Sequence, residues 1–221
     1  MINIDVISDT VCPWCFIGKR RLEKALADRP DYLFQINWRP FQLNPDLPKD
    51  GMSRAQYLAL KFGSDDRASK IYQTVHMAAL EEGLDIQFNG MNNQPNTLSS
   101  HRLIRWAGTA GVQNEVVELL FQEYFFNGRD IGDADTLASV AAKAGMDRDL
   151  VHELVLSGAD EKLVADEEVV ARRMGIAGVP CFVIDSKYAV SGAQDSAVLV
   201  NIFDLAFQDK RRVENSAQAT E

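Results

Sequence analysis

Alternating apolar and polar residues open the chain and then give way to a helical spacing. Residues 2–8 alternate isoleucine and valine with polar neighbours, which predicts a strand with a buried face. From Pro13 onward, apolar and small residues recur every three or four positions, so we expect an amphipathic helix that has ended by Pro30. Residues 32–40 alternate again, as a second strand would. The first part of the chain is therefore predicted to fold as strand, helix, strand.

A long helical region follows this opening. Residues 41–51 carry prolines and a glycine and should form a loop that leaves the sheet. Beyond this loop, the helical spacing predicts helices at 53–60, 66–82, 98–110, 114–126, 134–144, 147–156 and 160–174. Ser53 is placed to cap the first of them. The clearest apolar stripe belongs to the fourth helix and consists of Val117, Leu120, Phe121 and Tyr124.

Strand patterns return only near the C-terminal end. Residues 179–185 and 188–192 resemble two short strands joined by a turn, which predicts a hairpin. After them comes a last helix, followed by a polar tail that we expect to be frayed. The apolar side of this helix is predicted to carry Val198, Ile202, Leu205 and Ala206.

The order of these elements predicts an α/β protein with the thioredoxin fold (β-α-β … β-β-α) and an inserted all-helical domain. We assign residues 1–50 to the N-terminal half of this fold and 51–175 to the insertion. Residues 176–208 form the C-terminal half, and 209–221 the polar tail. This arrangement brings residues near positions 12 and 180 together, although they lie far apart in the sequence.

Composition and charge narrow the range of partners. The chain has 32 acidic and 23 basic residues and a formal net charge of −9, so a nucleic acid is not an expected partner. Its first residues lack the basic segment and apolar core of a secretion signal. No apolar run is long enough to cross a membrane. We therefore expect a cytoplasmic protein.

Two cysteines, Cys12 and Cys15, flank Pro13 and Trp14 where the first strand meets the first helix. The free N–H groups and the positive dipole end of a helix N-terminus stabilise an anion, so Cys12 is predicted to be a thiolate nucleophile. Cys15, one turn further on, can attack a mixed disulfide at Cys12 and release the substrate. Trp14 should be exposed between them, where it can contact a substrate. The basic residues 19–21 either favour the thiolate or form a solvated face.

Other uses of this cysteine pair are less well supported. Apart from it, the chain offers only Cys181 and three scattered histidines, which lack the paired spacing of a structural zinc site. We therefore expect no bound metal. A purely structural pair is the remaining alternative, although a reducing cytoplasm keeps ordinary thiols reduced. His101 lies on an apolar-striped helix, which is typical of a structural histidine.

A second motif, Val179-Pro180-Cys181, begins the third strand. In the predicted fold a cis-proline loop lies opposite the first helix at this point, where a backbone edge can pair with a substrate strand. The sequence alone favours an ordinary trans proline that enters an edge strand. Cys181 is predicted to be a buried core residue, with a third exchanging thiol near the pair as the alternative.

Six separated blocks of the sequence resemble one known family. They are SDTVCPWCFIGKRRLEKAL, WRPFQLNPDLP, NTLSSHRLIRWA, YFFNGRDIGD, AAKAGMD and MGIAGVPCFVIDSKYAVSGAQ. Together they resemble the FrnE-like branch of the DsbA family of thiol–disulfide oxidoreductases, over about positions 3 to 205. The same superfamily contains 2-hydroxychromene-2-carboxylate isomerases and kappa-class glutathione transferases.

The resemblance implies roles for individual residues. Cys12 would be the attacking thiol and Cys15 the resolving thiol, with Pro180 as the cis-proline. Pro13, Trp14 and Val179 would contact the substrate, Val179 through its backbone. Two positions depart from the DsbA pattern. Trp14 replaces a histidine that stabilises the thiolate, which implies a weaker oxidant, and Cys181 replaces a residue without a thiol.

Together these features predict a thiol–disulfide oxidoreductase that exchanges disulfides with protein or small thiol substrates through Cys12 and Cys15. Its reversible disulfide would serve in place of a tightly bound cofactor, with glutathione as a candidate co-substrate and a homodimer as a candidate assembly. One alternative is a glutathione-dependent isomerase or transferase, although related enzymes of that kind carry serine at the position of Cys12. The other is a non-catalytic, chaperone-like binding module.

Overall fold

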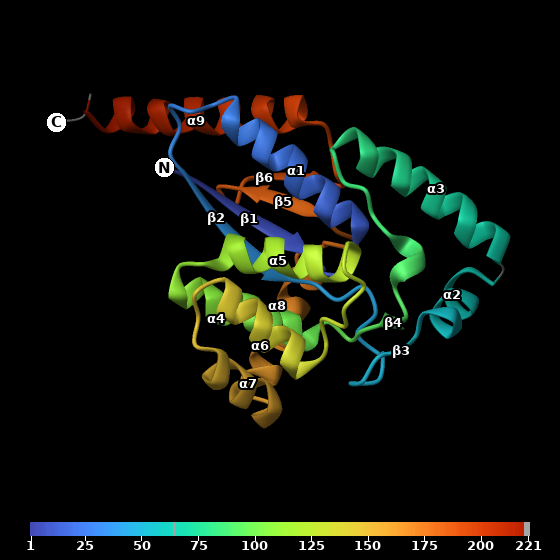
Figure 1. Cartoon of the computed structure of the whole chain (residues 1–221). Helices are drawn as coiled ribbons and strands as arrows, with labels where there is room; N and C mark the ends of the chain where they lie inside the picture. The colour runs from blue at the N-terminus through green and yellow to red at the C-terminus, as the bar shows by residue number, and fades with distance from the viewer. Residues whose placement is uncertain (64, 219–221) are drawn as a thin grey trace.

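A four-stranded mixed sheet lies at the centre of the molecule (Figure 1), of which the computed structural model describes residues 1–63 and 65–218. The strands are β1 (Ile2–Ser8), β2 (Phe34–Pro40), β5 (Cys181–Ile184) and β6 (Tyr188–Ser191). They follow the order β2-β1-β5-β6, with β1 parallel to β2 and antiparallel to β5, and with β5 antiparallel to β6. The predicted α/β thioredoxin fold is therefore confirmed.

Two helices cover one face of this sheet, and the others form the insertion between β2 and β5. The covering helices are α1 (Pro13–Ala27) and α9 (Ser196–Gln218), which lie side by side in Figure 1. The insertion contains α2 (Arg54–Phe62), α3 (Asp65–Glu81), α4 (Leu98–Ala110), α5 (Gln113–Phe125), α6 (Ala134–Lys143), α7 (Arg148–Ser157) and α8 (Glu161–Arg173). Each of its helices was predicted to within a few residues.

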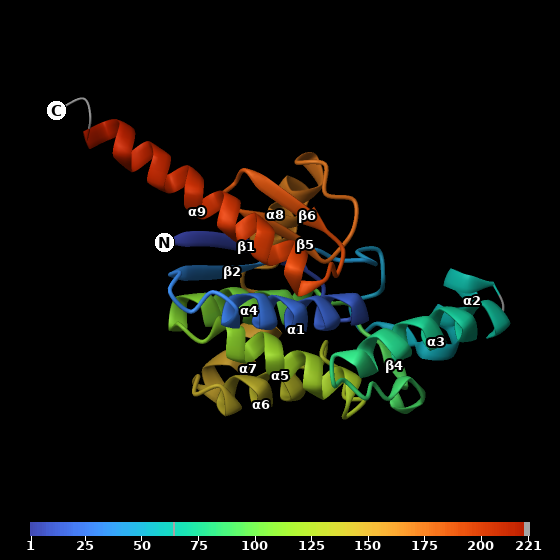
Figure 2. The same cartoon turned by 90° about the horizontal axis from the view of Figure 1, so that it is seen from above.

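Short elements connect the insertion to the sheet. The two-residue strands β3 (Met52–Ser53) and β4 (Asn93–Gln94) pair with each other, and the 3₁₀ helix η1 (Phe88–Gly90) precedes β4. The sequence did not predict any of the three. The helices α2 and α3 project from the body of the molecule on the side of these strands (Figure 2).

The alternation along β1 and β5 separates two cores. Val6 pairs with Phe182, and both point into the main core, which also holds apolar side chains of α1, α9 and the insertion. Ile7 pairs with Cys181, and both point to the opposite face, into a small cluster with Phe41 and with Ala171 of α8. Since successive residues of a strand face opposite sides, α1 and α8 lie on opposite faces of the sheet.

The last helix differs from its prediction in two ways. It continues through the polar tail as far as Gln218, while 219–221 lie outside the described residues. This extension has partners on the β5–β6 turn, since Lys210 pairs with Asp185 at 2.7 Å and the Tyr188 hydroxyl donates to Asp209 at 2.6 Å. Electrostatic contacts therefore continue the helix beyond its apolar stripe.

The apolar face of α9 is also rotated from the predicted one. Leu199, Val200, Phe203 and Ala206 are buried, whereas Val198 and Leu205 are 40% and 45% exposed. Two interleaved stripes with the same helical spacing occur in this segment, and the spacing alone does not distinguish between them.

Basic side chains of α1 bind acidic side chains of the insertion. Lys19 is buried and pairs with Glu118 of α5 at 2.6 Å, and Arg20 pairs with the same carboxylate at 2.5 Å. The next residue, Arg21, pairs with the nearly buried side chain of Glu82 at 2.7 Å. Of the two alternatives stated for residues 19–21, the solvated face is therefore wrong, because acidic residues of the insertion pair with all three side chains.

The Glu118 carboxylate is held in its charged form by these contacts. Burial by itself would raise its pKa, but hydrogen bonds from Arg20 and Lys19 outweigh burial and lower the pKa to about 2. Since this value lies below the ordinary value of 4.5, the ion pairs stabilise the fold fully above about pH 4.5. Their contribution is lost as the pH falls towards 2.

We predict that Glu118→Gln lowers the free energy of unfolding by about 2 kcal/mol at pH 7, because Lys19 and Arg20 lose their shared partner. The difference from the wild type should shrink as the pH falls from 4.5 towards 2. Urea unfolding at a series of pH values measures both effects. Glu115→Gln, an exposed change on the same helix, is the matched control. A pH-independent difference would contradict this account.

Candidate active site

The N-terminus of α1 carries the two cysteines of the motif. Cys12 caps the helix in an extended conformation (φ −90°, ψ 113°), and its carbonyl oxygen accepts the backbone N–H of Cys15 at 3.0 Å. Pro13 follows at the first helical position, where the missing N–H is not needed. The first turn of α1 contains no acidic residue. The helix dipole therefore acts on Cys12 without a competing negative charge in that turn.

Both cysteines are free thiols, and both are nearly inaccessible, with 4% of Cys12 and 1% of Cys15 exposed. The Cys12 thiol donates a weak hydrogen bond to the carbonyl oxygen of Val179, with an Sγ–O distance of 3.8 Å. The backbone N–H of Asp9 donates to Cys15 Sγ at 3.5 Å. Cys12 thus faces the loop that begins β5, while Cys15 faces the end of β1.

The pKa of the Cys15 thiol lies well above its ordinary value. Burial is the largest cause, and hydrogen bonding to Cys12 and the charge of Cys12 act in the same direction. Contacts with Ser8 and with the Asp9 backbone oppose the shift without reversing it. Cys15 therefore retains its proton at neutral pH.

The second motif lies against the first. The Val179–Pro180 peptide bond is cis, and the Pro180 carbonyl oxygen accepts the backbone N–H of Gly192 at 2.8 Å. Pro180 also packs closely on α1, because a Cβ atom at Gly18 would lie 2.9 Å from Pro180 Cγ and 3.2 Å from Phe182 Cζ. Only glycine allows this approach without a shift of the loop or the helix.

A buried carboxylate supports the loop between β1 and α1. The side chain of Asp9 is fully buried, and its Oδ2 accepts the backbone N–H of Leu43 at 2.7 Å. Its Oδ1 has no hydrogen-bond partner and lies 3.5 Å from Nε2 of the buried His101, which is itself 3.2 Å from the Phe41 carbonyl oxygen. His101 thus has the structural position predicted for it, next to an acidic residue that the sequence analysis missed.

A cavity of about 220 Å³ lies beside Cys12, between the N-terminus of α1 and the projecting helices α2 and α3. Four residues of the two sequence motifs line it, namely Cys12, Pro13, Trp14 and Val179. Its outer wall carries aromatic and basic side chains, namely Arg54, Tyr57, Lys61, Phe62, Tyr72, Phe88, Tyr124 and Phe125. Trp14 is partly buried in this wall and not fully exposed between the cysteines as expected. The inserted helices therefore shape the space in front of the thiol.

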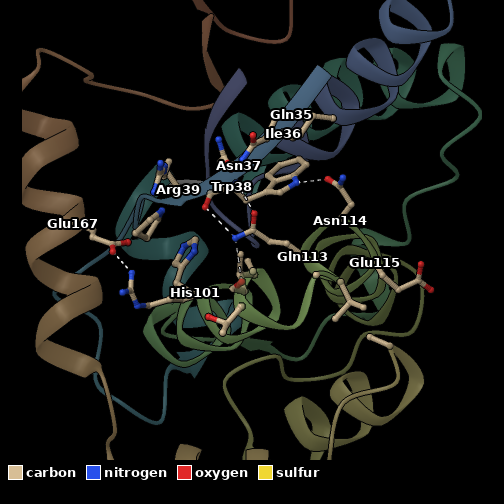
Figure 3. Close-up of a pocket in the computed structure, with 18 of the residues that line it drawn as sticks. Gln35, Ile36, Asn37, Trp38, Arg39, His101, Gln113, Asn114, Glu115 and Glu167 are labelled. Carbon is tan, nitrogen blue, oxygen red and sulfur yellow. Dashed lines mark hydrogen bonds and ion pairs between the residues drawn. The ribbon is translucent and has the colours of Figure 1, made fainter. Parts of the chain in front are cut away.

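A larger cavity, of about 750 Å³, lies away from the cysteines along the free edge of β2 (Figure 3). There the side-chain amide of Gln113 accepts the backbone N–H of Trp38 at 2.9 Å and so occupies the strand edge. Asn114 accepts the Trp38 indole N–H at 2.6 Å. The cavity contains neither thiol, and we attach no chemistry to it.

Cys181 lies apart from the Cys12 and Cys15 side chains. It points to the face of the sheet opposite the main core, into the small cluster with Ile7 and Phe41. Burial raises the pKa of its thiol, and a hydrogen bond with Ser191 opposes this only in part. This environment suits a structural residue. Its role as an auxiliary thiol stays a prediction.

Sequence reasoning missed the residues that the insertion contributes. Arg54, Tyr57 and Lys61 of α2 line the cavity because α2 folds back towards the N-terminus of α1, a long-range contact that no local pattern encodes. Asp9 did leave a signal, since a carboxylate stands between an apolar strand and the first cysteine. In the described part of the chain, no three His, Cys, Asp or Glu residues come close enough together to hold a metal ion. No helix there is long and apolar enough to cross a membrane.

Comparisons with known proteins agree with this geometry. A family model described as DSBA-like thioredoxin domain matches residues 3–204. The crystal structure of a probable DsbA oxidoreductase from Streptomyces coelicolor is 31% identical, covers 94% of this chain and 91% of that one, and superposes with a TM-score of 0.84. An uncharacterised protein of Bacillus subtilis, YwbO, is 28% identical over 66% of this chain and 68% of its own length.

A more distant structure shares the fold. The cytosolic disulfide reductase DsbM from Pseudomonas aeruginosa, solved with glutathione, is 15% identical with a TM-score of 0.58, covering 96% of this chain and 99% of that one. At this level of identity the likeness concerns the fold alone.

We predict that Gly18→Ala lowers the free energy of unfolding by about 1–3 kcal/mol, because the new methyl group pushes Pro180 and Phe182 away from α1. Denaturant unfolding measures the loss. Gly178→Ala is the control in the same loop, since a Cβ atom there meets no atom within 4 Å. Equal stability of Gly18→Ala and wild type would show that α1 and the loop are not tightly packed.

Proposed function

Because the chain belongs to the DSBA-like thioredoxin domain family of thiol–disulfide oxidoreductases, we propose that Cys12 and Cys15 form its redox pair. The observation that carries this proposal is the different environment of the two thiols. Cys12 lies at the N-terminus of α1 and lines the cavity, whereas Cys15 is buried behind it and keeps its proton. One thiol is thus placed to meet a substrate and the other to act after it.

The exchange takes place in two steps. The Cys12 thiolate attacks one sulfur of a substrate disulfide, so that a Cys12–substrate disulfide forms and the other substrate sulfur leaves as a thiolate. Cys15 then loses its proton to solvent and attacks Cys12 Sγ, which forms the Cys12–Cys15 disulfide and releases the second substrate thiolate. Two electrons pass from the pair to the substrate. The reverse sequence oxidises a dithiol substrate.

The residues around Cys12 have supporting roles on this proposal. Pro13 and Trp14 border the reacting sulfur, and the carbonyl oxygen of Val179, which accepts the Cys12 thiol in the free protein, becomes available to substrate backbone. Pro180 fixes the position of this carbonyl against α1. The candidate small-thiol co-substrate is glutathione. The proposed location of the protein is the cytoplasm.

The intact CPWC motif disfavours the two alternatives. A glutathione-dependent isomerase does not need a second cysteine, and a binding module would not depend on either thiol. Both predict that exchange through Cys12 is absent, so a trapping experiment separates them from the proposed reaction.

We predict that Cys15→Ser accumulates a mixed disulfide at Cys12, because the resolving thiol is missing while the attacking one remains. Incubation with oxidised glutathione or with a disulfide-bonded protein, followed by mass analysis without reductant, detects the adduct. Cys12→Ser should form no adduct and should lose insulin reduction, and Cys181→Ser should behave as wild type. An adduct of equal yield in Cys12→Ser would contradict the assignment.

The raised pKa of Cys15 makes the second step depend on pH. The rate at which wild-type protein resolves a preformed Cys12–glutathione disulfide should rise about tenfold per unit between pH 6 and 8, as the thiolate fraction of Cys15 grows. Quenched-flow mixing with alkylation measures this rate. A rate that stays flat over this range would mean that Cys15 is already ionised.

A further inference from the structure

The cavity beside Cys12 is lined by basic residues, although the protein as a whole is acidic. Among the described side chains that line it, only Arg54 and Lys61 are charged and none is an aspartate or glutamate, although the chain carries a net charge of −9. Among the side chains of residues 1–63 and 68–212, no carboxylate forms an ion pair with either cation. The two positive charges that share this cavity with the proposed nucleophile therefore have no neutralising carboxylate among these side chains.

The basic residues that line the larger cavity along β2 are neutralised by carboxylates. Its basic residues all have acidic partners: Arg39 pairs with Asp5 at 2.8 Å, Arg105 with Glu167, and Lys143 with Glu123 at 2.5 Å. In Figure 3, the dashed line that begins at Glu167 marks its ion pair with Arg105. Basic residues that line a cavity are thus paired in one place and unpaired in the other.

Arg54 is held in position although it lacks an acidic partner. The residue is only 8% exposed, its backbone N–H donates to the Asn92 carbonyl oxygen at 3.0 Å, and its guanidinium lies 5.0 Å from the centre of the Tyr72 ring. It also borders a neighbouring cavity of about 560 Å³, where the one carboxylate among the described lining residues, Asp85, is exposed and makes no ion pair with it. The ring stabilises the cation but does not replace a counter-charge.

Lys61 lies about two turns further along α2, on the same face as Arg54. Its ammonium donates to the Tyr57 hydroxyl at 2.6 Å and to Asn44 Oδ1 at 3.4 Å, both of them neutral groups. Tyr57 itself lines the cavity. The hydrogen bonds thus fix the ammonium at the rim and leave its charge uncompensated.

Burial of a guanidinium without a counter-ion is unfavourable, and binding of an anionic substrate would remove this cost. A carboxylate satisfies both donors, and an arginine can bind it with two parallel hydrogen bonds. The cavity volume of about 220 Å³ suits part of a small molecule, and its aromatic walls suit an apolar chain next to the charge.

We propose that Arg54, assisted by Lys61, binds a carboxylate of a small disulfide substrate and so directs Cys12 to disulfides of carboxylate-bearing thiols. The inference rests on the proposed exchange at Cys12 and specifies its substrate class. The chemistry is unchanged: the Cys12–substrate disulfide forms, and one substrate thiolate leaves.

The test compares oxidised glutathione with its methyl ester, in which the same disulfide is kept and the carboxylates have lost their charge. Reduced protein is mixed with each, and formation of the Cys12–Cys15 disulfide is followed by alkylation and mass analysis. Wild type should react about tenfold faster with the acid than with the ester, as loss of a charged hydrogen-bonded pair implies. Hydroxyethyl disulfide, which is small and uncharged, reports the reactivity of Cys12 alone.

Arg54→Gln should abolish most of the preference for the acid while it reacts normally with hydroxyethyl disulfide. Lys61→Gln should reduce the preference about threefold. Because Lys61 is exposed, this variant tests the site even if Arg54→Gln, a change at a buried position, impairs folding. Arg54→Lys should restore part of the preference. Arg105→Gln in the larger cavity is the matched control and should leave the preference at the wild-type value.

The outcomes separate this inference from the function on which it rests. If wild type does not react with hydroxyethyl disulfide, the proposed exchange at Cys12 fails. If it reacts but does not distinguish acid from ester, or if Arg54→Gln and Lys61→Gln keep the full preference, only the carboxylate site is refuted. A preference that appears only with acidic peptide disulfides would assign the cations to a protein substrate and overturn the small-molecule assignment.

Discussion

The approach of α1 to the Val179–Pro180 loop is the constraint on which the rest of the site depends. The antiparallel register of β1 and β5 pairs Ile7 with Cys181, so the end of β1 and the start of β5 lie side by side. The segments that follow and precede these strands must then meet, and they carry Cys12 and Val179. Gly18 permits the contact, because any side chain at this position would collide with the Pro180 ring. The sheet register thus fixes the position of the thiol relative to the backbone that would hold a substrate.

The insertion is part of this arrangement and not an independent appendage. Its helices α4 to α7 contribute to the same main core as the sheet and α1, and its acidic residues Glu82 and Glu118 bind three consecutive basic residues of α1. The helix that carries the cysteines is therefore held from both sides. At its N-terminal end the insertion adds α2 and α3, which close the cavity in front of Cys12. In the proposed function, the thioredoxin part supplies the reacting thiols, and the insertion supplies much of the wall of the cavity.

The sequence predicted correctly those features of the fold that depend on a few neighbouring residues. The four strands of the sheet, the helices α1 to α9 and the position of the cysteine pair follow from residue spacing, because periodicity and capping act over a few neighbouring residues. The phase of α9 could not be predicted, since Leu199 and Val198 belong to equally regular stripes and only packing selects one. The burial of Lys19 depends on Glu118, 99 residues further along the chain, and the position of Arg54 depends on its contacts with Tyr72 and Asn92. The same is true of Asp9, whose burial depends on the chain after β2.

The central claim is that Cys12 and Cys15 exchange reversibly between dithiol and disulfide. Equilibration of the protein in glutathione buffers of increasing oxidised fraction, with acid quenching, alkylation and mass analysis of each cysteine, tests it most directly. The account predicts one two-electron transition in which Cys12 and Cys15 are lost as thiols together, while Cys181 remains a free thiol throughout. Thiols at Cys12 and Cys15 that persist at every buffer composition, or a disulfide that involves Cys181 instead, would contradict it.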